Sequence, residues 1–356
     1  MGILDTCPIC GVPVQIGKYI EWNSNGTITQ KRDPTHRMLF YECKHLDRLF
    51  TGIEDIIGIS IDKYIVESKS RSIIQYIKKQ KSWPRGALAR PVVRNFMRNL
   101  SDGARLNGYG VIEVKELQWR KGYLRCAVTN PYSLPMVCGD IRGAFEAILN
   151  KTSEIKSEEV SPERYDLTCF WAPHAQELAS RLLPVSTKAK PGDYEFERCT
   201  NCDIPLEISK VRWDFDDGTI TNDELGVRVA LFGARAVQAV FDELKSELGR
   251  QIDDAIIEAQ RQYSLSLAKE QLKSAQQPKP ERQVNLKLAM AVTGLGNLVE
   301  LEVRSGGYQV RVENPSLPLV TVGNAIAFYE FITGKQSSSY WEITDDGDLN
   351  VELSPA

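Results

Sequence analysis

The sequence has no long apolar run and no leader-like start. No stretch approaches the ~20 consecutive apolar residues that span a membrane, and the opening Met-Gly-Ile-Leu-Asp-Thr-Cys has neither the basic start nor the apolar stretch of a signal peptide. We therefore expect a cytoplasmic, globular protein. In that compartment paired cysteines indicate metal or redox chemistry rather than a disulfide framework.

Histidine is scarce, which narrows the possible catalytic devices. The chain contains only His36, His45 and His174, and no two of them have the i, i+4 spacing of a helical metal site. Three histidines leave few ways to build a Ser-His-Asp or Cys-His catalytic arrangement, although Cys169 and His174 are close enough in sequence to form one such pair. No acid–base pair stands out at a recognisable spacing, so the sequence assigns no catalytic residue.

Phosphate-binding loops are also missing. Gly294-Leu295-Gly296 lacks the third glycine of a dinucleotide fingerprint, and no Gly-Lys-Ser/Thr loop occurs, so nucleotide chemistry is not expected. The 44 basic and 47 acidic residues give a net charge of -3. This balance by itself predicts neither a nucleic-acid nor a membrane partner.

What the sequence does contain is an internal repeat. Its 356 residues are 42% hydrophobic, which is enough for two or three domains with real cores. A shift of 192 places Cys7, Cys10, Pro13, Ile16, Lys18, Gly26, Thr27, Ile28 and Thr29 on identical residues from Cys199 to Thr221. A shift of 184 does the same for Val128, Asn130, Pro131, Gly139, Glu146, Ile148 and Lys151. Matches of this kind predict a duplicated unit.

The repeat divides the chain into two halves of the same organisation. We expect a first repeat over residues 1–183, a linker rich in Pro, Gly, Lys and Ser/Thr over 184–198, and a second repeat over 199–356.

Each half is predicted to begin with a hairpin and to continue as an α+β module. Residues 12–22 and 27–30 flank an Asn-Gly turn, which is typical of a β-hairpin. Apolar spacing predicts two long helices in each half, at 47–57 and 61–81 and at 227–248 and 252–275. Small antiparallel sheets with one helix each should follow, built from 111–117, 123–129, 139–149 and 165–171 and from 298–304, 308–313, 322–333, 340–344 and 349–353. The expected fold class is α+β with internal duplication.

The end of each half resembles a known domain. A strand, an Asn-Pro loop, a Gly-containing helix ending near Gly334-Lys335, and a strand with Trp341-Glu342 follow in order, over about 70 residues per half. This order resembles the 4-vinyl reductase domain, a small-ligand module related in fold to Golgi-transport tethering subunits and nitric-oxide-signalling sensors. The resemblance implies binding of hydrophobic or aromatic small molecules. The zinc cluster frequent in that family is not carried over, because only Glu342 matches it and residues 344–353 contain no cysteine.

Two Cys-x-x-Cys pairs are the strongest chemical signal. Each pair is half of a tetrahedral zinc site. If the halves pack about a pseudo-two-fold axis, Cys7, Cys10, Cys199 and Cys202 close one shared site. The alternative is two separate sites, with Cys43 and His45 completing the first, but the second half offers no matching residues. Zinc is the expected cofactor, while an iron–sulfur or catalytic metal and unmetallated, redox-active thiols remain open.

Other candidate residues depend on less specific patterns. Cys126, Cys138 and Cys169 are expected to be buried filler. Tyr132, Phe145, Phe328 and Tyr329 are candidates for an apolar pocket, though core packing explains them as well. Between residues 69 and 105 the chain holds ten basic residues, and a candidate anion or nucleic-acid surface consists of Lys78, Lys79, Lys81, Arg85, Arg90, Arg94 and Arg98.

These observations favour binding over chemistry. The sequence predicts a zinc-containing protein that binds an apolar or aromatic small molecule as a sensor or accessory factor. A metal-dependent reductase or accessory enzyme in tetrapyrrole or aromatic metabolism is the alternative, against which a closed four-cysteine site counts. A second alternative is a nucleic-acid-associated protein, or one with an acidic partner, that uses the basic stripe from Arg90 to Arg98.

Overall fold

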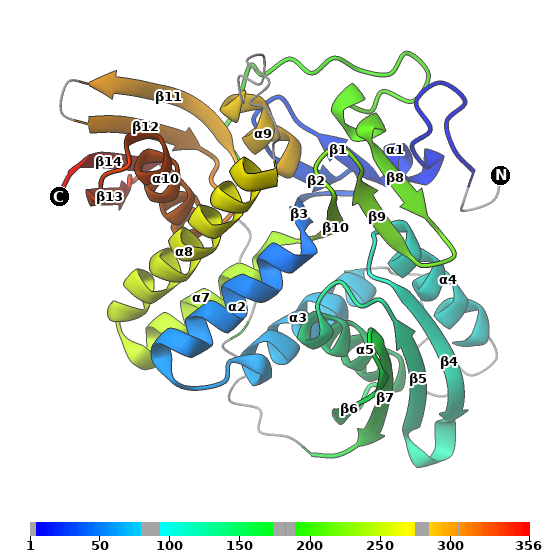
Figure 1. The fold of residues 1–356 in the computed structure, drawn as a ribbon. Coiled ribbons are helices and arrows are strands. Elements are labelled where there is room, and N and C mark those ends of the chain that lie inside the picture. The colour runs from blue at the N-terminus through cyan, green and yellow to red at the C-terminus, as the bar shows by residue number, and fades with distance from the viewer. Residues whose placement is uncertain (1–4, 80–92, 174–181, 183–188, 275–284, 305–306) are drawn as a thin grey trace.

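The computed structural model describes residues 5–356 except 80–92, 174–181, 183–188, 275–284 and 305–306. The described part combines helices with antiparallel sheets, as predicted (Figure 1). The first half contains α1 (Val14–Tyr19), β1 (Ile20–Trp22), β2 (Ile28–Gln30), β3 (Asp33–Glu42), α2 (Cys43–Ile57), α3 (Asp62–Lys79), α4 (Val93–Leu106), β4 (Val111–Gln118), η2 (Trp119–Lys121), β5 (Tyr123–Thr129), α5 (Leu134–Leu149), β6 (Ser153–Ser161) and β7 (Arg164–Trp171). The second half contains η3 (Leu206–Lys210), β8 (Val211–Asp214), β9 (Thr219–Asn222), β10 (Val227–Gly233), α7 (Ala234–Leu248), α8 (Gln251–Ser274), α9 (Leu286–Thr293), β11 (Asn297–Arg304), β12 (Gly307–Glu313), α10 (Pro318–Thr333), β13 (Ser337–Ile343) and β14 (Leu349–Pro355).

One sheet is shared by both halves of the chain. Its strand order is β1-β2-β3-β10-β9-β8, and the central pair, β3 with β10, is antiparallel with Phe40 opposite Leu231. The pairing buries both strands on both faces near the centre of the sheet. The segments 1–183 and 199–356 are therefore joined by backbone hydrogen bonds as well as by side chains.

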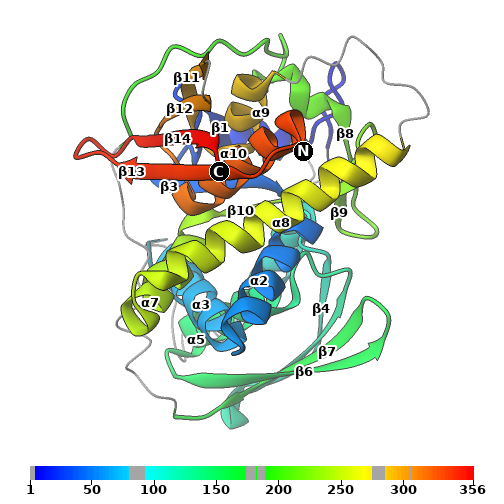
Figure 2. The same ribbon diagram turned by 60° about the vertical axis from the view of Figure 1, so that its left-hand side comes forward.

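Each half also forms a four-stranded sheet of its own. This sheet and the helices of the same half make up the first module, from α2 to β7, and the second module, from α7 to β14. The strand orders are β4-β5-β7-β6 and β11-β12-β14-β13. Helix α5 packs against α3 beside the first sheet, and α10 packs against α8 beside the second. Helices α2, α3, α7 and α8 also contact one another across the halves, so the two small sheets lie on opposite sides of a helical layer (Figures 1 and 2).

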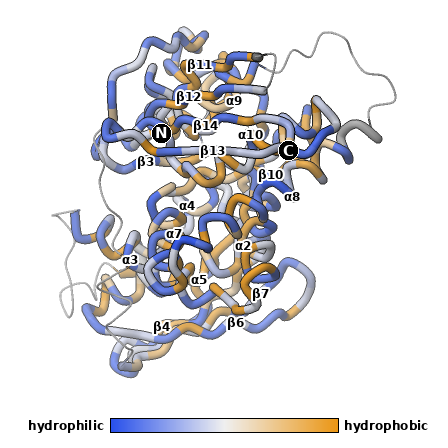
Figure 3. Tube along the Cα trace, turned by 90° about the vertical axis from the view of Figure 1, so that its left-hand side faces the viewer, coloured by the Kyte–Doolittle hydropathy of each residue, from blue (hydrophilic) through white to orange (hydrophobic). Residues whose placement is uncertain are grey.

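A continuous hydrophobic core crosses the helical layer. It includes Phe145 and Leu167 of the first half together with Phe241 and Val312 of the second. Hydrophobic segments gather in the middle of the molecule, whereas much of the β4 and β6 ribbon is hydrophilic (Figure 3). Within the described residues, no helix combines the length and the hydrophobicity that crossing a membrane requires.

Contacts between the halves come in reciprocal pairs. The guanidinium of Arg37 donates to the carbonyls of Asn314 and Pro315, and that of Arg228 donates to the carbonyls of Asn130 and Pro131. The two tryptophans of the shared sheet behave alike. Trp22 Nε1 donates to the Val292 carbonyl at 3.0 Å, and Trp213 Nε1 donates to the Leu106 carbonyl at 3.1 Å. Each half thus holds the other through the same kinds of contact.

Two of the expected elements are wrong. Residues 12–22 do not form one strand, because the chain turns into the short helix α1 directly after Pro13 and only Ile20–Trp22 is extended. The expected helix 227–248 begins instead as strand β10, which pairs with β3 and β9 on its two sides. A strand that is buried on both faces has no polar alternation, so its apolar run resembles a buried helix.

Candidate metal centre and cavity

The two Cys-x-x-Cys pairs meet in space. The Sγ atoms of Cys7, Cys10, Cys199 and Cys202 all lie within 4.8 Å of one another. The Cys7–Cys199 separation is 3.8 Å and the Cys10–Cys202 separation is 3.4 Å. A tetrahedral ion with metal–sulfur distances of about 2.3 Å requires sulfur–sulfur distances of about 3.8 Å. Four cysteines in this arrangement fit a tetrahedral metal ion.

The backbone around each pair has the same conformation. The Cys7 N–H donates to the Val12 carbonyl at 2.8 Å, and the Cys199 N–H donates to the Ile204 carbonyl at 2.8 Å. The residue four positions after each first cysteine is left-handed, with φ of 74° at Gly11 and 61° at Asp203. This tight turn places both thiols of a pair on one side of the loop, where they meet the other pair.

The surroundings favour ionisation of one thiol in each pair. Burial opposes ionisation of Cys7, but hydrogen bonds from the Cys10 N–H and the Asn201 amide outweigh it and lower the pKa of Cys7 to about 6. The backbone N–H groups of Asn201 and Cys202 lower the pKa of Cys199. Burial raises the pKa of Cys10 and of Cys202. A bound cation would stabilise the thiolates of Cys10 and Cys202 and so reverse this unfavourable ionisation.

The cluster is closed rather than open to substrates. Cys7 is 2% exposed and Cys199 is 3% exposed, while Cys10 and Cys202 are half-buried. Four thiolates fill a tetrahedral coordination sphere and leave no position for a substrate. Among the described residues Cys43 and His45 join no such cluster. The His45 ring is instead held by Tyr41 Oη at 3.1 Å and by Gln260.

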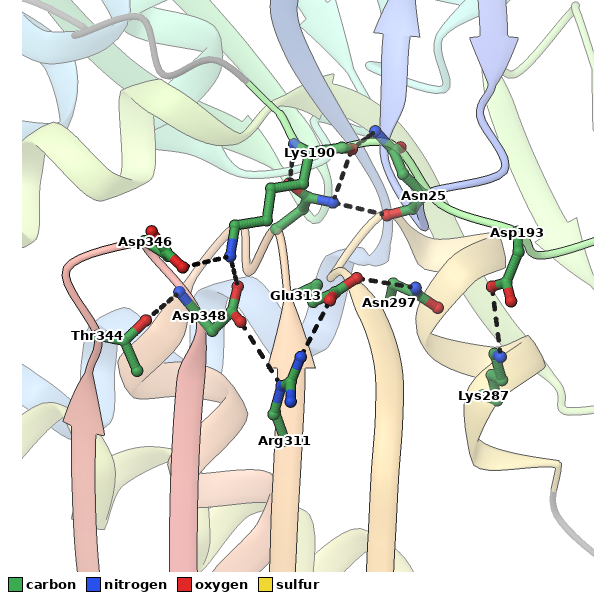
Figure 4. A network of polar contacts seen from close by, with 11 residues as sticks. Asn25, Lys190, Asp193, Lys287, Asn297, Arg311, Glu313, Thr344, Asp346 and Asp348 are labelled. Atoms are coloured by element: carbon green, nitrogen blue, oxygen red, sulfur yellow. Dashed lines mark hydrogen bonds and ion pairs between the residues drawn. The ribbon is translucent and has the colours of Figure 1, made fainter.

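The chain before the second cysteine pair ties the first hairpin to the second module (Figure 4). Lys190 Nζ donates to Asp348 Oδ1 at 2.7 Å, and the Lys190 N–H donates to Asn314 Oδ1 at 2.7 Å. The Asn25 amide of the first hairpin donates to the Lys190 carbonyl at 2.7 Å. The described part of the expected linker therefore packs against both the first hairpin and the second module.

A cavity of about 600 Å³ lies between the shared sheet and the first module. Helix α1 and strand β3 wall it on one side, and helices α3, α4 and α5 wall it on the other. Apolar side chains dominate the lining, among them Ile16, Met38, Ile73, Leu100 and Ile141. The volume and the apolar walls are typical of a site for a small organic molecule. Nothing in the local sequence pattern signals this cavity, because its walls come from widely separated segments.

The other candidate residues have varied positions. Tyr132 is buried, stacks on Tyr109 with ring centroids 4.2 Å apart, and lies behind the cavity wall. Phe145 and Tyr329 are core residues, and Phe328 is half-buried beside Tyr308. The side chains that line the 600 Å³ cavity do not include these four candidates.

The four cysteines outside the centre are Cys43, Cys126, Cys138 and Cys169, and all are buried, as expected for the last three. Burial raises the pKa of Cys126 and of Cys138 to about 12, which makes them unreactive thiols. Cys169 is buried on β7, and His174, its suggested partner, lies outside the described residues.

The basic stripe is described only in part. Lys81, Arg85 and Arg90 lie outside the described residues, and of Arg94 only the position in α4 is described. Lys78, Lys79 and Arg98 are exposed, and Lys79 forms an ion pair with Asp33. Arg98 faces a groove between α4 and β4 that also carries the acids Asp102, Glu113 and Glu116. Arg105, Lys115, Arg120 and Lys121 line the same groove, so the anion or nucleic-acid surface stays a prediction.

Comparisons of the chain with protein-family models, curated proteins and solved structures find no match. The functional interpretation therefore rests on the chemistry and geometry of the metal centre and the cavity.

Proposed function

We propose that this chain binds a small, mainly apolar molecule in the cavity between the shared sheet and the first module. The cavity itself carries the proposal, since a concave, mainly apolar space of about 600 Å³ with a few polar groups is what a site for a small organic molecule requires. The mostly non-polar lining favours a ligand whose body is hydrocarbon or aromatic.

The metal centre has a structural role in this proposal, with zinc as its ion. Its four cysteines come from both halves, so one ion fastens the beginning of each half to the other. Helix α1 follows Cys10 after a short turn, and Ile16 and Tyr19 of this helix line the cavity. The ion thereby fixes one wall of the ligand site.

We further infer that the halves arose by duplication of one ligand-binding unit. Supporting observations are the common order of elements in the two halves, the matching turns at the cysteine pairs, and the reciprocal Arg37 and Arg228 contacts. The order of two strands, Asn-Pro loop, helix and two strands in each module is compatible with the 4-vinyl reductase-like interpretation.

Binding of an apolar probe tests the proposed function. N-phenylnaphthylamine, a neutral dye that fluoresces in apolar surroundings, is expected to bind the purified protein at one molecule per chain. Ala104 lies on the cavity wall in α4, so Ala104→Phe fills part of the space and should weaken dye binding about tenfold or more.

Val303→Phe adds the same ring at an exposed position of β11 and serves as the control, since Val303 is 73% exposed. Urea unfolding verifies that each variant is folded, and Ile73→Phe provides a second filling variant on α3. Equal dye binding by the cavity and the surface variants, or no binding by the natural chain, would contradict the proposal.

A further inference from the structure

We propose that the molecule bound in this cavity is an apolar monocarboxylate whose carboxylate lies against the ammonium of Lys69. This inference rests on the proposed function and adds the chemical class of the ligand. It comes from a cluster of ionisable and hydroxyl groups in a mainly apolar lining, formed by Lys69, Asp140, His36 and Tyr109.

Lys69 is an unusual lysine because it is almost completely buried. It is 3% exposed and lines the cavity, and its Nζ lies 3.3 Å from Asp140 Oδ1. An ammonium carries three N–H donors. Asp140 is the one acceptor that faces Lys69 Nζ among the described residues, and the rings of Tyr109 and Tyr132 lie 5.3 Å and 6.0 Å from the same nitrogen. Lys69 therefore keeps donor capacity for an oxygen of a ligand.

The remaining ionisable groups of the lining favour an anion. Burial and the nearby charge of Lys69 lower the pKa of His36 to about 4, so the imidazole is neutral at pH 7 and keeps one N–H to donate. The Asp140 carboxyl is already engaged, by Lys69 and by the Tyr132 hydroxyl at 3.2 Å. Arg32 adds a second cation to the lining at an exposed position. Water screens the exposed Arg32, so the buried Lys69 is the group that would hold an anion, because a ligand carboxylate would give its remaining N–H donors an acceptor.

The second half shows what the same position looks like without a charged pair. Gly139 of α5 lies against Lys69, and Gly323 of α10 lies in the same way against Gln260 of α8. The residues that follow these glycines are Asp140 and Asn324, and Gln260 Nε2 donates to Asn324 Oδ1 at 2.7 Å. The fold therefore accommodates a neutral amide pair at this helix crossing. A buried Lys–Asp pair is not required for packing, which favours a ligand-binding role for it.

The test compares two ligands that differ only in the head group. Decanoate and decanol are each titrated at pH 7.5 against the complex of the protein with N-phenylnaphthylamine, and displacement of the dye is measured. Decanoate is expected to displace the dye from the natural chain at a concentration about tenfold lower than decanol, because charge-assisted hydrogen bonds are stronger than neutral ones.

The double variant Lys69→Gln with Asp140→Asn copies the amide pair of the second half and should remove this preference while dye binding persists. The exposed pair Lys335→Gln with Asp345→Asn makes the same charge changes far from the cavity and should keep the preference. Equal displacement by decanoate and decanol in the natural chain, or a preference that survives the Lys69 and Asp140 exchange, would overturn the carboxylate assignment with the binding function intact. Absence of dye binding would instead overturn both proposals.

Discussion

Replacement of Cys199 by serine is expected to lower the free energy of unfolding by about 5 kcal/mol or more, a large part of the roughly 5–15 kcal/mol of a typical domain. The physical reason is that structural zinc contributes roughly 10–16 kcal/mol in isolated zinc fingers. An ion held by these cysteines would also join segments 192 positions apart in sequence. Zinc content by mass spectrometry and urea unfolding are the two measurements, and the Cys199→Ser protein should lose its metal.

A double-mutant cycle shows whether one ion serves both pairs. If Cys7 and Cys199 hold the same ion, Cys7→Ser and Cys199→Ser should cost similar amounts, and the double variant should cost little more than either. Two independent sites would give additive losses. Cys138→Ala removes a buried thiol outside the centre and should retain the metal. A metal-free natural chain whose unfolding is unaffected by Cys199→Ser would rule out the structural zinc and favour redox-active thiols.

The metal centre could be predicted from sequence because its signal is local and repeated. The Cys-x-x-Cys spacing predicts two ligands per hairpin, and the internal shift predicts that the hairpins correspond. The absence of a second-half match for Cys43 and His45 favoured a shared site, and all four predicted cysteines lie together. Here sequence separation was no obstacle, since the pairing follows from the repeat.

The cavity could not be predicted because it depends on how distant segments pack. Lys69 belongs to a basic stretch that the sequence indicates as a solvated or nucleic-acid-binding face, yet it is buried against Asp140 of another helix. Helical spacing tells which residues share a face but not which face is covered. The shared sheet was missed for a similar reason, since β10 acquires its identity from pairing with β3 and β9.

Replacement of Gly218 by alanine is expected to lower the free energy of unfolding by about 3–5 kcal/mol, which places it among the severe single substitutions. Gly218 forms the turn of the second hairpin with φ of 63°, and a Cβ there would lie 2.4 Å from the Gly110 carbonyl group of the first module. The Gly110 N–H also donates to the Gly218 carbonyl at 2.9 Å, so the two backbones cannot separate without breaking this bond. The backbone is too rigid to absorb such an overlap.

Gly226 is a matched control in the next turn of the same sheet, between β9 and β10. It has φ of 67°, and a Cβ there would meet nothing within 4 Å. Gly226→Ala should therefore lower the free energy of unfolding only by the about 1–2 kcal/mol that the left-handed conformation costs an alanine. As in any glycine-to-alanine change, the smaller conformational entropy of the unfolded chain offsets part of this loss. The difference between Gly218→Ala and Gly226→Ala in urea unfolding isolates the steric contact between the halves. Equal losses would mean that the hairpin turn does not bear on the first module.

The reciprocal contact extends this test to the other end of the molecule. Gly26 forms the turn of the first hairpin with φ of 73°, and its Cβ would lie 2.3 Å from the Gly296 carbonyl oxygen of the second module. Gly26→Ala should therefore cost as much as Gly218→Ala. Each metal-bearing hairpin then braces the module of the opposite half. Loss of the ion would release both braces at once, which is why a small four-cysteine centre is expected to control the stability of the whole chain and the shape of its ligand cavity.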